Sequence, residues 1–391
     1  MNSIKIAVIA GEISGDILAG NLIKHLKEMT LDPISLVGVG GSSLQREGLV
    51  SLFDFSELSI MGITQVIRHL PRLIWRIQQT VESIISYKPD ILLIVDSPDF
   101  THRVAKRIRN RLPNLPIVNY VCPSVWAWRA GRARDMRAYI DQVLAILPFE
   151  AESMRRLEGP PTIFVGHPLS NDATILEVYA HQKNKKIASD SKRRILLLPG
   201  SRAKEISRVL PIFGDAMRSL LKRNPSFTMS LVTVPSQENL IRQMVDGWDI
   251  CPEIIVDEKE KKRAFIECDA AMAVSGTVIL ELALCGIPVV SVYKSEWIVN
   301  LLSNYIKVWT CALPNLIVDY PVVPEYFNNM IRCESLVRWV ERLANDTLQR
   351  RAMLQGFDTM WDRMNTQIPA GQMAAQIILR ILGKRKTFSL K

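Results

Sequence analysis

The segment Gly11-Glu12-Ile13-Ser14-Gly15-Asp16 combines glycines with polar side chains directly after the apolar run Ile4–Ile9. Glycine permits a tight turn and the close approach of a ligand, and the helix that follows offers free N–H groups. The Glu12 carboxylate falls at the carboxyl end of a strand, where open α/β sheets bind their ligands. A structural alternative stays open, in which Ser14 or Asp16 caps the helix.

A second pair of carboxylates lies in Asp96-Ser97-Pro98-Asp99-Phe100, which follows the apolar run Ile91–Val95. Two carboxylates at a strand end, in the same half of the chain as Glu12, form a plausible general-base cluster. The same letters are also typical of a plain turn, and the two interpretations carry equal weight. Because both segments end strands, we expect them at the same level of one sheet.

The C-terminal half contains Pro199-Gly200-Ser201-Arg202 and Ser275-Gly276-Thr277, each between a strand-like run and a helical pattern. Backbone N–H groups at such helix starts bind phosphate oxygens, and Arg202 adds a forked donor. Glu281, one turn into the second helix, can accept hydrogen bonds from two vicinal hydroxyls of a ribose. Two such turns predict a nucleotide site, whereas the missing G-x-G-x-x-G spacing disfavours a dinucleotide-dependent oxidoreductase.

The segment Cys122-Pro123-Ser124-Val125-Trp126-Ala127-Trp128-Arg129 joins aromatic and basic side chains, and further arginines follow up to Arg137. Nucleic-acid binding is compatible with this pattern, and so is tryptophan packed in a core. Cys122 has no partner at a catalytic or metal-binding spacing. The histidines are dispersed, so the sequence predicts no metal site, and His167 either lines a cleft or serves the structure.

The elements that must position these residues alternate along all 391 residues. Near-continuous apolar runs separated by helical patterns predict parallel sheets covered on both faces. The pattern pauses where few apolar residues occur and then restarts. We therefore predict an α/β protein with domains at residues 1–170 and 195–365, a linker region at 171–194, and a C-terminal helical segment at 366–391.

Composition narrows the class of protein. With 48% hydrophobic residues the chain can bury real cores, and six scattered cysteines suit a reducing compartment rather than a disulfide scaffold. The N-terminal apolar run is too short for a signal peptide. The apolar stretch Ala270–Tyr293 is interrupted by glycine, proline and Glu281, so we expect strand, turn, helix and strand rather than a membrane span.

The net charge of +10 is concentrated in residues 60–140, which hold thirteen basic and five acidic side chains. This region contains an amphipathic helical pattern across Val66–Ser86 with arginines along another face. Such a helix could lie on an anionic membrane surface or pack on the sheet as an ordinary helix. Pro71 must kink or split it.

Taken together, nine motifs in this order resemble those of the lipid-A-disaccharide synthases, the glycosyltransferases of bacterial outer-membrane lipid A assembly. The motifs are Ala10-Gly-Glu-Ile-Ser-Gly-Asp16, Met61-Gly62, Val95-Asp-Ser-Pro-Asp-Phe100, Pro123-Ser-Val-Trp-Ala-Trp-Arg129, Leu147-Pro-Phe-Glu150, Val165-Gly-His-Pro-Leu169, Leu198-Pro-Gly-Ser-Arg202, Ser275-Gly-Thr277 with Glu281, and Leu313-Pro-Asn-Leu316. Departures occur at Ile13, where threonine is expected, at Cys122, where serine also occurs, and at Phe327-Asn328-Asn329, where glutamine is usual.

The resemblance implies a GT-B fold, in which two Rossmann-like domains face each other across a cleft and the C-terminal helices cross back to the first domain. It also implies an inverting reaction. UDP-2,3-diacylglucosamine would give its sugar to 2,3-diacylglucosamine 1-phosphate (lipid X), forming a β-1,6-linked disaccharide 1-phosphate and UDP. No cofactor is expected.

Carried over to this sequence, the resemblance makes Asp96 the general base, with Asp99 and Asp16 as chemical alternatives. The expected catalytic residues are Glu12, Asp16, Asp96 and Arg202. The expected donor-binding residues are Gly200, Ser201, Arg202, Ser275, Gly276, Thr277, Glu281 and Asn315. The expected acceptor or cleft residues are Ser14, Gly15, Asp99, Ser124, Trp126, Arg129 and His167. Asn328 or Asn329 could replace the usual glutamine contact.

Both implied substrates carry acyl chains, so we expect a protein of the cytoplasm that binds the anionic cytoplasmic face of the inner membrane. The expected membrane-facing residues are Met61, Ile63, Arg68, Arg72, Trp75 and Arg76, with the face Leu70–Ile77. The family also suggests a homodimer, and no nucleic acid is expected. Two alternatives remain: another GT-B enzyme acting on a UDP-sugar, such as a peptidoglycan glycosyltransferase or a sugar-nucleotide epimerase, or a basic nucleic-acid-binding protein.

Overall fold

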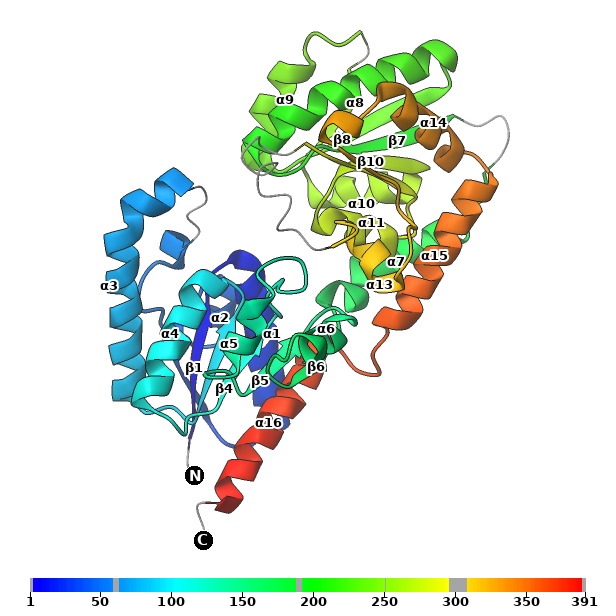
Figure 1. Ribbon diagram of the computed structural model, residues 1–391. Helices are drawn as coiled ribbons and strands as arrows, with labels where there is room; N and C mark the ends of the chain where they lie inside the picture. The colour runs from blue at the N-terminus through cyan, green and yellow to red at the C-terminus, as the bar shows by residue number, and fades with distance from the viewer. Residues whose placement is uncertain (1–2, 59–62, 188–191, 250, 295–307, 389–391) are drawn as a thin grey trace. The chain divides into compact units, whose positions relative to one another are not determined.

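A computed structural model describes residues 3–58, 63–187, 192–249, 251–294 and 308–388, with the side chains of 63–70 and 384–388 left out. The chain divides into two compact units (Figure 1). The first unit comprises Met1–Pro168 and Thr366–Lys391, and the second comprises Leu169–Asn365. Each unit is described by itself.

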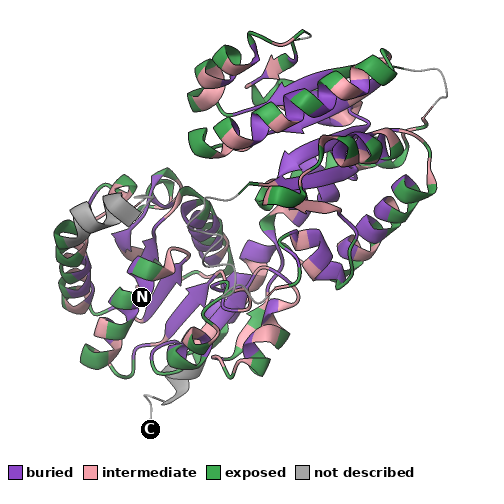
Figure 2. Cartoon of the chain, turned by 45° about the horizontal axis from the view of Figure 1, so that its top comes forward, coloured by how far each residue is buried: buried purple, intermediate pink, exposed green. Residues whose placement is uncertain are grey.

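Among the described residues of the first unit, six parallel strands form a sheet in the order β2-β1-β3-β4-β5-β6. Every residue of the central strands β3 and β4 is buried, whereas the edge strands β2 and β6 are only partly buried; the buried strands are purple in Figure 2. Strands covered on both faces need apolar side chains on both, which explains the continuous apolar runs. The strands are β1 (Ile4–Ala10), β2 (Ile34–Val39), β3 (Ile91–Val95), β4 (Ile117–Tyr120), β5 (Gln142–Ala145) and β6 (Thr162–Phe164).

Helices cover both faces of this sheet. Along β1 the buried side chains alternate between two clusters, so Ile6 and Val8 join one and Ala7 and Ile9 the other. The first cluster includes α1 and α16, and the second includes α3 and α4. The helices are α1 (Ile13–Met29), α2 (Ser42–Arg46), η1 (Phe55–Leu58), α3 (Ile63–Tyr87), α4 (Pro98–Arg111), α5 (Gly131–Met136), α6 (Glu150–Arg156) and α16 (Ala370–Phe388).

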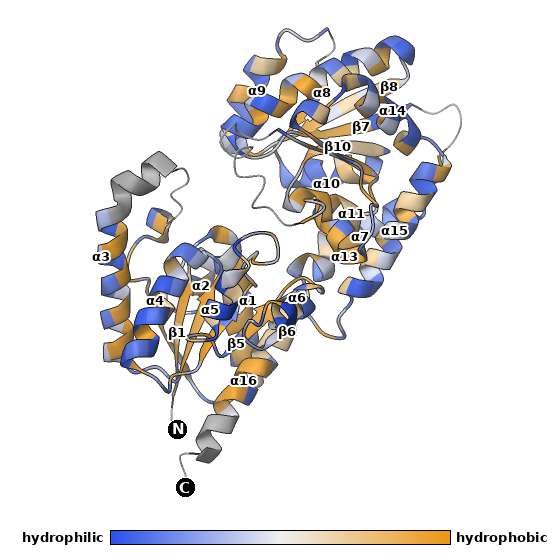
Figure 3. Cartoon of the chain, viewed as in Figure 1, coloured by the Kyte–Doolittle hydropathy of each residue, from blue (hydrophilic) through white to orange (hydrophobic). Residues whose placement is uncertain are grey.

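The C-terminal helix α16 packs against α1, and Figure 3 shows the apolar character of α16. The two helices approach so closely at Gly371 that a Cβ there would lie 1.8 Å from Oδ1 of Asn21. A larger residue here would force the Asn21 side chain to move. Helix α3 contains Pro71 but runs unbroken from Ile63 to Tyr87, so the proline does not split it.

In the second unit, six parallel strands of the described chain are ordered β12-β11-β10-β7-β8-β9. Counted along the chain this is the 3-2-1-4-5-6 order of Rossmann folds. The strands are β7 (Arg193–Leu198), β8 (Phe227–Val232), β9 (Glu253–Ile255), β10 (Ala270–Val274), β11 (Val289–Tyr293) and β12 (Glu325–Phe327). The helices are η2 (Pro168–Asn171), α7 (Ala173–Lys183), α8 (Ala203–Arg223), η3 (Pro235–Gln237), α9 (Glu238–Val245), α10 (Glu258–Glu267), α11 (Thr277–Leu284), α13 (Leu313–Val318), η5 (Asn328–Met330), α14 (Cys333–Ala344) and α15 (Leu348–Met364).

Residues 171–194 do not form the linker we expected, because they contain helix α7 and the first residues of β7. The Asp172 carboxylate caps α7 by accepting from the N–H groups of Thr174 and Ile175 at 2.9 and 3.0 Å. The polar Gln182 is buried, and its Nε2 donates to three carbonyl oxygens, including that of Phe265 at 2.6 Å. Helix α7 buries one narrow face and is held in place by the hydrogen bonds of the Gln182 amide. It therefore contains too few apolar residues to be predicted from the sequence pattern.

The α/β class predicted from the sequence is confirmed, with two parallel sheets and their helices. The apolar stretch Ala270–Tyr293 forms β10, α11 and β11, as expected. Within the part of the chain that the structure describes, no helix is long and apolar enough to span a bilayer. Strand β12 was not anticipated, because three residues at a sheet edge show no apolar run.

Candidate active site

The loops that carry the carboxylates predicted in the first unit lie where the strand order reverses. Strands β1 and β3 are neighbours, with Ala10 paired to Val95, so the segments that follow them lie side by side. Open α/β sheets bind ligands at such a reversal. The Ser14 hydroxyl lies 3.5 Å from Oδ2 of Asp96, and Glu12 precedes the first residue of α1.

Two glycines allow this close approach. A Cβ at Gly11 would lie 2.4 Å from Cβ of Ser97, and one at Gly15 would lie 3.2 Å from the carbonyl oxygen of Val95. Larger side chains would push the two loops apart. The predicted use of glycine in this turn therefore has a specific cause, which is contact with the β3 loop.

Asp96 is held in a strained conformation. Its φ is +56° and that of Ser97 is +43°, in the left-handed region that non-glycine residues rarely adopt. The Thr101 hydroxyl donates to the carbonyl oxygen of Asp96 at 2.8 Å, and the Ser97 N–H donates to its Oδ1 at 2.8 Å. Oδ2 has only the long Ser14 contact among the described residues, so this oxygen can take a proton from a substrate hydroxyl.

Asp16, which we expected among the catalytic residues, has a structural role. Its side chain is buried, and its carboxylate accepts from the N–H groups of Gly41, Ser43 and Leu44 at 2.7, 2.8 and 3.2 Å. These N–H groups begin the short helix α2, so Asp16 caps α2 rather than its own helix. A carboxylate so fully used by backbone donors is poorly suited to accept a proton.

Asp99, the other alternative base, lies in the first turn of α4 with its side chain 85% exposed. Its closest charged neighbour is Arg132, whose Nη2 is 3.6 Å from Oδ1 of Asp99. Asp99 lines the same pocket as Asp96 but lacks the fixed backbone that aims the latter. The geometry therefore favours Asp96 as the base.

The tryptophan-containing segment after β4 has a partly buried residue, Trp126, and several exposed ones. Trp126 Nε1 donates to Oε1 of the buried Glu150 at 3.2 Å, and Glu150 also accepts from the N–H groups of Ile146 and Leu147. Burial raises the pKa of Glu150 to about 7. Ser124 and Trp128 are exposed, as is Arg129. Trp126 is thus fixed in place but is not among the described residues that line the pocket at Asp96, and its pairing with Glu150 could not be predicted because nothing local in the sequence links the two.

Two other residues of this unit are buried. Burial raises the pKa of the Cys122 thiol, so it stays protonated and forms part of the pocket wall, as predicted. Burial lowers the pKa of His167 to about 4, so its imidazole is neutral. His167 lies between β6 and η2 and is not among the described residues that line the pocket at Asp96.

The second unit has its own reversal of strand order, between β7 and β10, and the predicted donor segments meet there. A pocket of about 410 Å³ lies at this point, within the roughly 300–1,000 Å³ of small-molecule sites. Gly200 adopts a φ of +107°, which opens the first turn. The predicted residues that line the pocket are Gly200, Ser201, Arg202, Ser275, Gly276, Thr277 and Glu281.

The pocket lining also includes residues that the sequence did not suggest, among them Lys261 and Thr233. Lys261, from α10, places Nζ 2.9 Å from Oε1 of Glu281. Burial alone would lower the pKa of Lys261, but the neighbouring carboxylate outweighs it and raises that pKa. Thr233 follows β8, and its buried hydroxyl has no hydrogen-bond partner among the described residues, so it is available to a ligand.

Asn315, which we expected in the donor pocket, is instead part of the core. Its Nδ2 donates to the carbonyl oxygen of Val323 at 2.9 Å, and its Oδ1 accepts from the N–H groups of Val322 and Val323. It is not among the described residues that line the pocket, and neither are Asn328 and Asn329, which follow β12. Arg202 is 60% exposed and pairs with Glu205 at 2.9 Å, so it can turn towards a phosphate.

The predicted membrane-facing residues fall into three groups. Met61 lies outside the described residues, as do the side chains of Ile63 and Arg68. Arg72 and Trp75 are exposed, with the Trp75 ring 56% accessible.

Arg76 and Ile77 do not face outward as we expected. Arg76 forms a two-pronged ion pair with Glu57, at 2.9 Å from Nε and 2.7 Å from Nη2, and its guanidinium covers the Phe53 ring. Ile77 is buried in the core. From Ile77 onward the apolar side chains of α3 therefore pack on the sheet, whereas Ile74 and Trp75 remain exposed.

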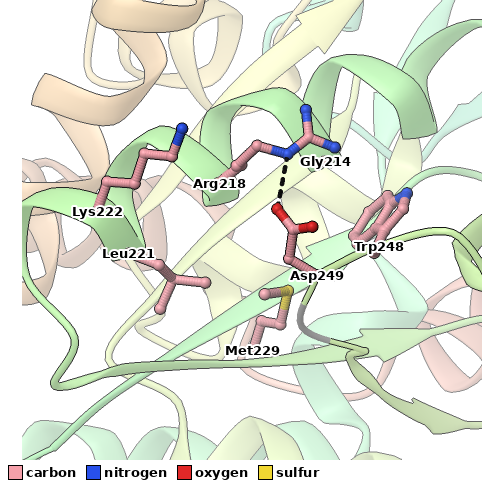
Figure 4. A pocket seen from close by; sticks show the side chains of 7 residues that line it. All are labelled: Gly214, Arg218, Leu221, Lys222, Met229, Trp248 and Asp249. Carbon is pink, nitrogen blue, oxygen red and sulfur yellow. Dashed lines mark ion pairs between the residues drawn. The ribbon is translucent and has the colours of Figure 1, made fainter.

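A further hollow in the second unit lies between α8 and Trp248 (Figure 4). A Cβ at Gly214 would lie 2.6 Å from the Trp248 ring, so the glycine makes room for it. Arg218 pairs with Asp249 across the hollow at 3.4 Å. Met229, the third residue of β8, lines the hollow, and no residue that lines the hollow also lines the pocket at Gly200 and Ser275. No group of three or more potential metal ligands occurs among the described residues.

Comparison with known proteins decides between the alternatives. Residues 6–369 match the family model for lipid-A-disaccharide synthetase. The chain belongs to this family. The lipid-A-disaccharide synthase of Nitrobacter winogradskyi is 42% identical over 383 residues, covering 97% of this chain and 96% of that protein. That of Rhodopseudomonas palustris strain HaA2 is 42% identical over 386 residues, covering 97% of each.

Solved structures place the fold of this lipid-A-disaccharide synthetase family member among GT-B proteins. The crystal structure of Acinetobacter baumannii MurG has a TM-score of 0.59 at 13% identity, covering 97% of this chain and 100% of that one. A UDP-GlcNAc 2-epimerase from Neisseria meningitidis bound to UDP-GlcNAc has a TM-score of 0.57 at 13% identity, covering 98% and 100%. The family resemblance and the fold class predicted from the sequence are thus confirmed.

Proposed function

We propose that this chain joins two acylated sugars, taking UDP-2,3-diacylglucosamine as donor and 2,3-diacylglucosamine 1-phosphate as acceptor. The observation that supports the proposal is that one chain has the Asp96 carboxylate where the strand order of the first sheet reverses. It also has a pocket suited to phosphate and ribose where the strand order of the second sheet reverses. The family relationship supplies the substrate class. The products are a β-1,6-linked disaccharide 1-phosphate and UDP.

The transfer follows from the chemistry of these groups. The 6-hydroxyl oxygen of the acceptor attacks C1 of the donor sugar while Oδ2 of Asp96 takes its proton. The bond from C1 to the diphosphate breaks, and its electron pair leaves with UDP. Because attack comes from the face opposite the diphosphate, the configuration at C1 inverts.

On the donor side, the negative charge that grows on the diphosphate needs donors already in place. Arg202 and the N–H groups at the start of α11 supply them. Glu281 would accept from the ribose hydroxyls, and Lys261 holds its carboxylate in the pocket. Thr233 offers a further hydroxyl to the nucleotide.

We also propose that α3 binds the membrane that holds the acyl chains through its exposed side chains around Ile74 and Trp75. Ile74 and Trp75 are 46% and 56% exposed, and Arg72 beside them is exposed. Exposed apolar side chains beside an arginine suit an anionic lipid surface, and Arg72 also pairs with Glu57 at 2.9 Å.

The test is a reconstituted reaction of the full chain with both acylated substrates in detergent micelles, measuring disaccharide and UDP. The best variant is Asp96→Asn, because asparagine tolerates a positive φ whereas alanine would add backbone strain. We expect turnover to fall about 10²- to 10⁴-fold while the dissociation constant for UDP stays unchanged.

Glu28→Gln, on the exposed face of α1, is the matched control and should keep full turnover. Substantial activity in Asp96→Asn would remove Asp96 as the base. Conversion of UDP-GlcNAc to its epimer, with no disaccharide formed, would favour the sugar-nucleotide epimerase instead.

A further inference from the structure

The pocket beside Asp96 contains more chemistry than a general base requires. It has a volume of about 190 Å³ and lies at the carboxyl ends of β3 and β4 and the start of α4. Arg129 and Arg132 line it, with His102 and Asn119. Proton transfer needs only the carboxylate, so the cationic and imidazole groups call for a separate ligand group.

His102 is a buried histidine in the lining of this pocket. The side chain is 97% buried, since its exposed fraction is 3%, and its Nδ1 lies 3.0 Å from the Tyr139 hydroxyl. Nε2 is buried and makes no hydrogen bond of normal geometry among the described residues, although the neighbouring Asn119 side chain acts on the imidazole. Buried polar atoms are nearly always paired in folded proteins, so Nε2 has capacity for a ligand atom.

The neutral state of this pair lets Nε2 act as a donor. Burial lowers the pKa of His102 to about 3, and the charge of Arg132 acts in the same direction. Burial also raises the pKa of Tyr139 to about 12, so the phenol keeps its proton. When the Tyr139 hydroxyl donates to Nδ1, the single imidazole proton is on Nε2, which can then donate it to a ligand oxygen.

The two arginines have capacity left for an anion. Arg132 is partly buried, and its Nη2 donates to the carbonyl oxygen of Pro98 at 3.0 Å, which fixes the side chain while leaving other N–H groups. Arg129 lies over the Trp128 ring at 4.2 Å and has no ion-pair partner among the described residues. A stacked arginine keeps the in-plane N–H groups that bind phosphate.

Backbone strain gathers at the same place. Asp96, Val121 and Arg129 all line the pocket and have φ values of +56°, +73° and +53°. The left-handed region is especially unfavourable for a β-branched residue such as Val121. The Asn119 side chain holds this turn by donating to the carbonyl oxygen of Val121 at 2.8 Å. Strain maintained by the surrounding fold is typical of ligand sites.

We propose that this pocket binds the phosphate monoester of the acceptor, with Arg129, Arg132 and the Nε2 of His102 as its donors. The inference rests on the proposed function and deepens it. A phosphate monoester carries nearly two negative charges and three oxygens, which match two guanidinium groups and one further N–H. Binding it here anchors the acceptor sugar beside Asp96.

The test compares two acceptors: 2,3-diacylglucosamine 1-phosphate and the same lipid without its phosphate. The variants are Arg132→Gln and Arg129→Asn, the latter because asparagine accepts the positive φ and the site is exposed, so the fold is safe. Arg134→Gln is the matched control, an exposed arginine of the same segment that pairs with Glu158 outside the pocket.

We expect each variant to lower kcat/KM for the phosphorylated acceptor by about 10- to 100-fold and for the other acceptor by less than about threefold. The dissociation constant for UDP should not change in either variant. The control should match the wild type with both acceptors.

Equal losses with both acceptors would overturn the inference, since the arginines would then act without the phosphate. Weaker UDP binding without a change in acceptor preference would also overturn it, because the pocket would serve the donor diphosphate. A wild-type chain that makes disaccharide from neither acceptor would overturn the proposed function and this inference with it. An active wild type whose variants show no selective loss overturns the inference alone.

Discussion

The role of Asp16 offers a sharp test, because its type and position in sequence suggested catalysis and its contacts indicate structure. In Asp16→Asn one carboxylate oxygen becomes an amide NH₂. If the remaining oxygen keeps the bonds from Gly41 and Leu44, the new NH₂ faces the N–H of Ser43, and that bond is replaced by two opposed donors.

The expected cost follows from that single lost contact. A hydrogen bond to a charged acceptor contributes about 1.5–3 kcal/mol. For a unit of about 150–250 residues, 1 kcal/mol shifts Tm by about 2–4 °C. Asp16→Asn should therefore lower the Tm of the first unit by about 3–12 °C, and Asp16→Ala by more, because it removes all three bonds.

The assay pairs thermal unfolding, followed by circular dichroism, with turnover measured well below the transition. A capping role predicts a lower Tm with kcat within about tenfold of the wild type. Glu28→Gln, on the exposed side of the same helix, should move Tm by less than about 2 °C. An unchanged Tm together with a kcat loss of about 10²-fold or more would refute the capping argument and return Asp16 to the candidate bases.

Three further predictions address stability and membrane contact. Because burial raises the pKa of Glu150 in the folded chain to about 7 from 4.5, the free energy of unfolding should fall as the pH rises from about 4.5 to 7. In urea titrations Glu150→Gln should be less stable than the wild type, and its free energy of unfolding should depend less on pH across that range. An equal pH dependence in the wild type and the variant would contradict this prediction. Gly371→Ala should destabilise the first unit by about 1–3 kcal/mol, because the new methyl group clashes with Asn21. Adding Asn21→Ala to this variant should restore most of the lost stability. An unchanged Tm in Gly371→Ala alone would count against this packing. Replacing both Ile74 and Trp75 with serine should weaken binding to anionic vesicles at least about tenfold in sedimentation assays. The control Gln78→Ser, at an exposed position of the same helix, should bind like the wild type. Equal binding by the wild type and both variants would exclude Ile74 and Trp75 as a membrane contact.

Much of the architecture was predictable because it depends on local pattern. Continuous apolar runs such as Ile91–Val95 predicted buried parallel strands, and the glycine-containing turns after them marked the ligand edges. The residues at those turns, including Asp96 and Arg202, were found because strand ends and helix starts are short-range features. Helix α7 was missed because its stability comes from Gln182 and a narrow apolar face rather than from a repeated pattern.

Which predicted residues work in the site, and which support the fold, was decided by contacts between distant segments. Asp16 and Asn315 have the same polar chemistry as the candidate residues that line the pockets, yet the backbone groups of Gly41–Leu44 and Val322–Val323 occupy them. Conversely, His102 and Lys261 gave no sequence signal, because a lone histidine or lysine acquires meaning only from its neighbours in space.

The sequence by itself determined the class of fold and the family, and it predicted two candidate sites where the strand order reverses, since these rest on periodicity, the order of motifs and turn chemistry. Only the tertiary structure decided how each polar group is employed. A carboxylate, amide or guanidinium is available for chemistry only where the fold leaves it an accessible donor or acceptor, and pairing in a folded chain joins residues far apart in sequence, as Arg76 with Glu57 or Glu150 with Trp126.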